Sequence, residues 1–152
     1  MVTHILNKIK DVLEEKDLKY YCEEQNGRIG VNFPGSIMMF RVTSEFVVFK
    51  SVFKGDIPKE KRRDVLEYLN DVNCILQEGH IEMDEEGTVQ FRICIDLLAE
   101  QDISEYRLWL IMGKGAHAEQ TFHEGIYQIV EENMEPSKAF EEAFHKLVKR
   151  SA

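Results

Sequence analysis

Four residues in one short stretch, Lys114, His117, Glu119 and His123, have side chains that could bind a ligand or transfer a proton. Glu119 and His123 are four positions apart, so on a helix they share one face. A bound metal ion needs three or four ligands, and no two of the five histidines have the four-residue spacing that places two imidazoles on one ion. The simplest interpretation is a hydrogen-bonded surface pair, and the alternative is a small-ligand or metal-binding sensor or enzyme.

Two further segments resemble binding loops only superficially. Gly113-Lys114-Gly115 lacks the four residues between glycines, and the Ser or Thr after the Lys, that a Walker phosphate loop requires. The acidic run Asp84-Glu85-Glu86-Gly87 lacks the alternating ligands and the distal Glu of a calcium-binding loop. We interpret the first as part of a helix and the second as the turn of a hairpin.

The cysteines give no sign of a catalytic or metal site. Cys22, Cys74 and Cys94 are odd in number, far apart and without a neighbouring His, so neither a disulfide framework nor a zinc knuckle is encoded. No Ser-His-Asp or Cys-His arrangement is recognisable either. We therefore predict no catalytic residue, no metal ligand and no cofactor.

Composition favours one globular domain in the cytoplasm. The chain has 152 residues, of which 43% are hydrophobic and 31% charged, enough for one continuous core. It has no apolar run long enough to cross a bilayer, and its first ten residues lack the apolar region and cleavage site of a signal peptide. We expect no membrane association.

Charge argues against a nucleic-acid partner. The formal net charge is −9, whereas binding to phosphates needs a clustered basic face. The one local exception is a basic group at the start of a predicted helix, formed by Lys59, Lys61, Arg62 and Arg63. We interpret it as a solvated helix face, with a docking patch for an acidic partner as the minor alternative.

The first half of the chain predicts a helix followed by a meander of strands. A helix from Thr3 to about Lys16 is indicated by Thr3 as its cap and by apolar residues at helical spacing: Ile5, Leu6, Ile9, Val12 and Leu13. From Leu18 the apolar period becomes two, and the turn at 25–27 predicts a hairpin. β-branched and aromatic runs over 37–42 and 46–53 continue the meander.

The second half predicts three helices around a second hairpin. Pro58 fits the first turn of a helix that Gly79 can end, and strands follow over 80–84 and 89–97. Asp102 and Glu105 resemble a capping box for a long helix over 104–133. The glycines at 113 and 115 either break this helix or let another backbone come close, and we favour a continuous helix with a weak point there. Pro136 begins a last amphipathic helix.

The surplus apolar surface of the last two helices indicates an interaction site. The last helix has a wide apolar face, which a small domain must bury on its own core, on a second subunit or on a partner. Trp109 on the long helix suits either a core edge or an interface anchor. The candidate partner-binding residues are Trp109, Phe140, Phe144 and Leu147.

Four segments of the middle of the chain resemble the YbjN-like bacterial domain family. They are Asp56-Ile57-Pro58, Val65-Leu66-Glu67-Tyr68-Leu69-Asn70-Asp71-Val72-Asn73, Gly79-His80-Ile81-Glu82-Met83-Asp84 and Gly87-Thr88-Val89-Gln90-Phe91-Arg92. The likeness covers roughly residues 3 to 133, and its motifs are structural ones, so no catalytic residue comes with them.

The resemblance implies an α+β fold with a mainly antiparallel sheet, a meander plus a hairpin, flanked by helices and similar to type III secretion chaperones. It divides the chain into a domain over 1–135 and a C-terminal helix over 136–152 that packs on the domain or on a partner. It also implies a homodimer and a non-catalytic, chaperone-like or regulatory protein-binding module that acts through its sheet edge and helix surfaces.

Overall fold

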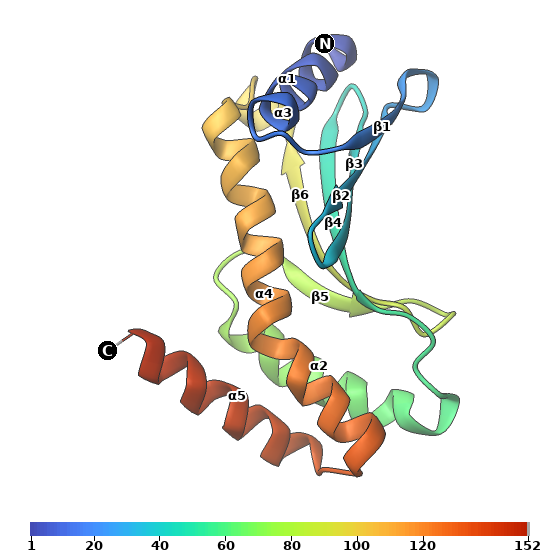
Figure 1. Cartoon of the computed structure of the whole chain (residues 1–152), viewed down its shortest axis with the longest axis vertical. Helices are drawn as coiled ribbons and strands as arrows, with labels where there is room; N and C mark the ends of the chain where they lie inside the picture. Colours follow the sequence, from blue (N-terminus) through green and yellow to red (C-terminus); the bar gives the residue numbers. More distant parts are fainter. Residues whose placement is uncertain (152) are drawn as a thin grey trace. The chain divides into compact units, whose positions relative to one another are not determined.

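A computed structural model describes residues 1–151 and, at Lys54, the backbone alone. Five α-helices are present: α1 (Val2–Glu15), α2 (Arg62–Ile75), α3 (Leu97–Glu100), α4 (Glu105–Glu132) and α5 (Pro136–Ser151). The strands are β1 (Tyr20–Glu23), β2 (Arg28–Phe33), β3 (Ser36–Val42), β4 (Phe46–Lys54), β5 (His80–Met83) and β6 (Val89–Asp96). Figure 1 labels these helices and strands. Two 3₁₀ turns, η1 (Glu24–Asn26) and η2 (Lys59–Lys61), precede β2 and α2.

The six strands form one antiparallel sheet in the order β1-β2-β3-β4-β6-β5. Strands β1 to β4 are the predicted meander, and β5 with β6 is the predicted hairpin, so the α+β fold class is confirmed. The chain divides into two compact units. The first unit comprises Met1–Ser51 and Arg92–Ala116, and the second comprises Val52–Phe91 and the chain from His117 onward.

In the first unit, α1 and one face of the sheet form the core. The five apolar residues predicted to share a stripe of α1 are all buried, and α1 contacts β3. Alternate strand residues face the same core, among them Ile29, Met38 and Phe40, and the Phe40 and Phe49 ring centroids are 5.0 Å apart. The period-two pattern therefore identified the buried face of these strands.

In the second unit, α2 packs against β5 and α5. The Asn73 amide fixes α2 to β5, because its Nδ2 donates to the Ile81 carbonyl at 2.9 Å and its Oδ1 accepts from the Ile81 N–H at 2.8 Å. Tyr68 is fully buried, and its hydroxyl donates to the Phe122 carbonyl of α4 at 2.9 Å. Burial raises the pKa of this phenol far above its usual range.

Helix α4 is continuous through Gly113 and Gly115, as predicted. Gly115 lets the helix approach β4, since a Cβ there would lie 2.8 Å from the Phe49 ring. Gly113 faces open space instead. One glycine of the pair is thus required by packing, and the other is not.

Three predicted helix boundaries are wrong. Helix α1 begins at Val2 with no side-chain cap, so Thr3 lies inside it. Ser104 rather than Asp102 caps α4, because its Oγ accepts from the Arg107 N–H at 3.0 Å. Helix α2 ends at Ile75, before Gly79.

A short helix follows β6 where the sequence predicted more strand. Asp96 ends the strand because its carboxylate accepts from the N–H groups of Leu98 and Ala99 and so caps α3. Among the helices described here, none is both long enough and apolar enough to span a bilayer.

Candidate protein-binding surfaces

Strand β1 forms one edge of the sheet. It pairs with β2 in the register Tyr20↔Val31 and Cys22↔Ile29, and the Asn32 N–H donates to the Lys19 carbonyl at 3.2 Å. In an antiparallel pair, the residues that exchange hydrogen bonds alternate with residues that do not. Because Lys19 is bonded to Asn32, the next residue, Tyr20, does not bond to β2, and neither does Cys22 two residues on. The N–H and C=O groups of Tyr20 and Cys22 therefore point away from β2, toward the open edge.

Polar contacts with α1 hold this edge strand in place. The Tyr20 hydroxyl donates to Glu14 Oε1 at 2.6 Å, and the Lys10 ammonium donates to Glu24 just beyond β1. The bond to Lys10 lowers the pKa of the Glu24 carboxyl, and the bond to Glu14 raises the pKa of the Tyr20 phenol. The strand edge is therefore positioned by the helix on its core side.

An open hollow of about 490 Å³ lies beside β1 on the sheet. Tyr21 and Ile37 border the hollow and are 68% and 69% exposed. A Cβ at Gly30 would meet nothing within 4 Å. The hollow is lined by Lys19, Tyr20, Tyr21, Gly30, Val31, Asn32, Ile37 and Met38. An apolar side chain of a bound segment could occupy this hollow, next to the unpaired N–H and C=O groups of Tyr20 and Cys22.

Trp109 lies half-buried on the first-unit part of α4. Its ring centroid is 6.5 Å from that of Phe33, and the Lys16 ammonium lies 4.9 Å from the indole ring. This cation–π contact covers part of the ring from within the chain. Trp109 as a partner contact stays a prediction.

The other three candidate residues lie on α5. The helix buries Ala139 and Ala143, whereas Phe140 and Leu147 are half-buried and Phe144 is 41% exposed. The Phe140 and Phe144 rings stack with centroids 6.0 Å apart. The apolar face of α5 is thus wider than the part that α2 and the rest of the second unit cover.

The four residues of the candidate ligand site, Lys114, His117, Glu119 and His123, all lie along α4. His117 and His123 are both exposed, and Thr121 between them donates its hydroxyl to the His117 carbonyl at 2.8 Å. Within residues 1–151, no group of three His, Cys, Asp or Glu side chains could hold a metal ion. No observation of the structure favours a ligand site there.

The basic group before α2 is partly structural. The Arg62 guanidinium donates to the carbonyls of Ile57 at 2.9 Å, Glu85 at 2.9 Å and Glu86 at 3.1 Å. Lys61 donates to the Asn133 side chain. Arg62 therefore clamps the β5–β6 turn. The prediction of a solvated helix face is wrong for this residue.

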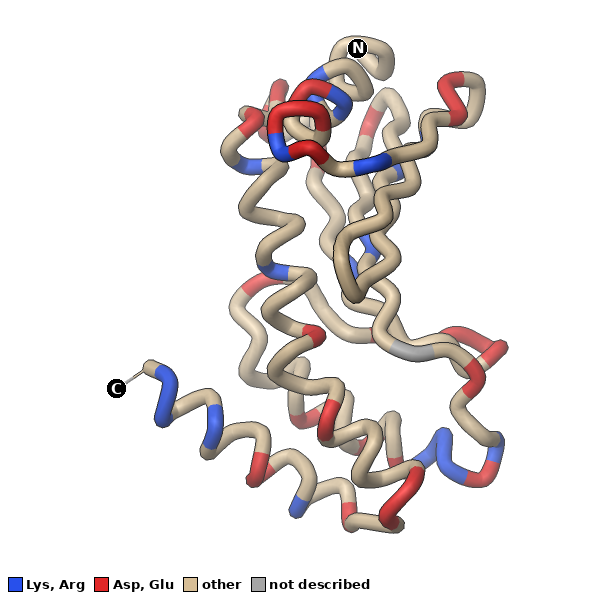
Figure 2. Tube along the Cα trace, in the orientation of Figure 1, with Lys and Arg blue, Asp and Glu red and all other residues tan. Residues whose placement is uncertain are grey.

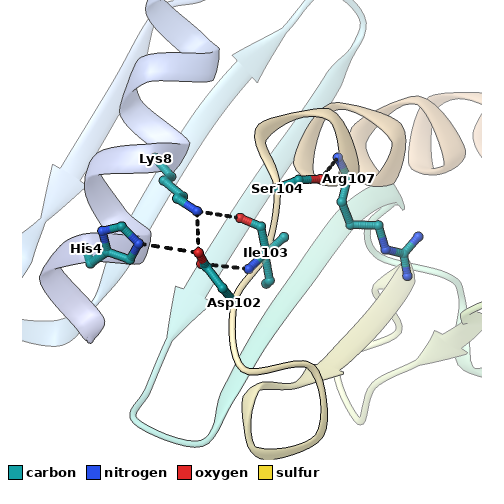
Figure 3. Close-up of polar contacts among 6 residues, drawn as sticks. All are labelled: His4, Lys8, Asp102, Ile103, Ser104 and Arg107. Carbon is teal, nitrogen blue, oxygen red and sulfur yellow. Dashed lines mark hydrogen bonds and ion pairs between the residues drawn. The ribbon is translucent and has the colours of Figure 1, made fainter.

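A polar cluster that the sequence did not predict joins α1 to the start of α4 (Figure 3). The Lys8 ammonium donates to Asp102 Oδ2 at 2.7 Å and to the Ile103 carbonyl at 3.1 Å, and His4 Nε2 lies 3.6 Å from the same carboxylate. The Lys8 bond, helped by the Ile103 N–H, lowers the pKa of the Asp102 carboxyl. A carboxyl held in its charged form is a structural tie and a poor general acid.

No protein-family model matches the chain, and no curated protein matches its sequence. Solved structures match its fold. A chain of the ExsC–ExsE complex covers 82% of this chain and 94% of its own length with a TM-score of 0.65 at 14% identity.

Two further structures extend this likeness. A chain of the complex between the Yersinia pestis type III secretion chaperone SycH and a fragment of YscM2 has a TM-score of 0.56 at 10% identity, covering 77% of this chain and 98% of that one. YbjN from E. coli has a TM-score of 0.52 at 11% identity, and the match covers 84% of this chain and 89% of YbjN. The chain has the fold of YbjN and the type III secretion chaperones. The fold inferred from the sequence resemblance is confirmed.

Within this chaperone-like fold, sequence reasoning missed the hollow beside β1. The signal was present in consecutive apolar residues, Tyr20-Tyr21 and Ile37-Met38-Met39, where a half-buried strand would alternate with polar residues. One member of each run faces the core, and its neighbour must face outward. Such runs predict apolar surface on the second face of a sheet.

Proposed function

We propose that the chain is a non-catalytic protein-binding module that takes an extended segment of a partner at the open edge of β1. The observation that carries this proposal is the coincidence of free main-chain groups at Tyr20 and Cys22 with the apolar hollow at Gly30. The protein complexes among the structural neighbours support a protein as the partner. The role would be chaperone-like or regulatory, in the cytoplasm.

Adding a strand to an edge suits a partner that is unfolded or locally extended. Main-chain hydrogen bonds supply affinity without regard to sequence, and side-chain pockets supply selectivity. A four-residue edge strand offers few such bonds. The hollow must therefore contribute part of the affinity, because net hydrogen-bond energies in water are small.

Selection from a random peptide library tests this proposal. Peptides of about ten residues, enough to span an edge strand, are displayed on phage and panned against the folded chain. A selected peptide should slow hydrogen exchange at the Tyr20 and Cys22 amides, while the Tyr21 amide, already paired with Gly30, serves as the internal control. Failure to select any peptide, or protection confined to other elements, would refute an edge-binding function.

We further propose a homodimer that uses α5. Phe144 and Val148, which are 41% and 50% exposed, lie on the flank of α5 that the second unit leaves open. An isologous contact between two such flanks would bury the same apolar residues twice. The helix surface would then serve self-association, and the sheet edge would serve the partner.

A further inference from the structure

One face of the first unit's sheet points away from α1. Tyr20 reaches α1 through its hydroxyl, so Tyr21 and the residues in register with it point to the opposite side. We call this side the outer face. Its side chains form three rows across β1, β2 and β3: Lys19–Asn32–Ile37, Tyr21–Gly30–Met39 and Glu23–Arg28–Arg41.

The outer face is basic although the chain is acidic. Arg28 and Arg41 are exposed and stand directly opposite each other in the β2–β3 register, an arrangement that destabilises a sheet when the charges are alike. The neighbouring Glu23 accepts a hydrogen bond from the Asn26 side chain at 3.3 Å. Figure 2 shows how the acidic and basic residues are distributed along the whole trace. In a chain of net charge −9, two facing arginines favour an anionic ligand.

The adjacent row is apolar and hollow. Gly30 leaves a gap between Tyr21 and Met39, and Ile37 in the next row, which is 69% exposed, borders this gap. A large apolar side chain of a ligand would fill this gap.

The spacing of the rows matches an extended peptide. Neighbouring rows are two residues apart along each strand, about 7 Å, which is also the distance between side chains on one face of an extended partner. We propose that the segment added at the β1 edge is acidic and that its side chains reach across the outer face, with a large apolar side chain directed into the gap at Gly30 and an Asp or Glu two positions away directed toward Arg28 and Arg41. This inference rests on the proposed function, because it specifies the partner of the same sheet.

The selected peptide pool tests the charge rule directly. Pools from wild type should be enriched in sequences with a large apolar residue two positions from Asp or Glu. The double variant Arg28→Glu with Arg41→Glu should select Lys or Arg at that position. It should also bind the best wild-type peptide about tenfold more weakly, because that is the affinity that two exposed charge-assisted hydrogen bonds contribute.

A second variant tests the hollow. Gly30→Val places a side chain in the hollow. The fold should persist, because a Cβ at this position meets nothing within 4 Å. The best wild-type peptide should bind about tenfold more weakly, because the hollow is already occupied. Ile75→Val, a smaller change on α2 in the second unit, is the matched control and should bind as wild type does.

The outcomes separate the two proposals. Peptides selected without an acidic bias, or equal binding by the double variant, would overturn this inference and leave the edge-binding function standing. No selected peptide at all would overturn both. Sedimentation of wild type and the double variant checks a different occupant: a wild-type dimer that the double variant lacks would assign the outer face to a second copy and overturn the inference.

Discussion

Two glycines of α4 differ in what surrounds them, and this difference predicts opposite effects of the same substitution. A Cβ at Gly113 meets nothing within 4 Å, so Gly113→Ala should stabilise the helix by about 0.5–1 kcal/mol. A Cβ at Gly125 would lie 2.3 Å from the Tyr68 hydroxyl, which is buried and bonded to Phe122, so Gly125→Ala should destabilise by about 1–3 kcal/mol. Urea unfolding of both variants measures this, and equal effects would show that the Tyr68 ring is not fixed there.

Asp102 predicts a pH dependence with a definite sign. Its folded pKa is lowered below the ordinary 3.8, first by the Lys8 bond, so its contribution to stability is complete above that value and is lost as the pH falls through the folded pKa. Asp102→Asn should therefore flatten the loss of stability below about pH 4, and Lys8→Met should do the same. Urea midpoints across a pH series measure the effect. An unchanged acid dependence in both variants would contradict the tie between α1 and α4.

At the residue scale, the sequence predicted buried residues better than polar partners. The α1 stripe and the alternating strand residues could be identified because apolar periodicity is local. The contacts of Arg62 with Glu85 and of Asp102 with Lys8 could not, since these partners lie 23 and 94 positions away and depend on how loops meet. The candidate residues Phe140, Phe144 and Leu147 were found by helical spacing, whereas Gly30 matters only because its neighbours in the register are large.

At the scale of elements, the Arg62 clamp is the contact that joins α2 to the β5–β6 turn. Arg62→Met removes a donor from the carbonyls of Ile57, Glu85 and Glu86, which should destabilise the chain by about 1–3 kcal/mol. Arg62→Lys should not restore stability, because one ammonium cannot reproduce the planar fork. Arg63→Met, an exposed neighbour, is the control and should change little. Thermal unfolding measures all three, and a stable Arg62→Met variant would show the clamp to be dispensable.

Element types were predictable from the sequence, and several element ends were not. The strands and long helices follow from period two and period 3.6, and the resemblance supplied their arrangement. The boundary errors arise where a side chain competes for main-chain groups, as Asp96 does when it ends β6 and caps α3. The predicted division at residue 135 coincides with the loop before α5 and stays a prediction.

At the scale of the whole molecule, net charge and local charge have different consequences. A net charge of −9 keeps copies apart at long range, so self-association needs an apolar contact to offset the repulsion. The outer face concentrates arginines where an acidic segment could bind, and α5 exposes Phe144 and Val148 at a separate place in the sequence. One acidic chain can therefore combine a partner site with a self-association site.

The proposed homodimer gives the prediction for the assembly. Phe144→Asp adds a negative charge to each α5 in a contact that must be apolar, so it should convert a wild-type dimer to monomer in sedimentation velocity. Tyr106→Asp, the same kind of change at an aromatic residue 71% exposed on α4, is the control and should leave the dimer intact. In Phe144→Asp the Phe140 ring loses its stacking partner, which could destabilise the fold. Circular dichroism must therefore show that both variants are folded. A wild-type monomer, or a dimer that persists in Phe144→Asp, would remove α5 from the interface and leave its exposed flank for a protein partner.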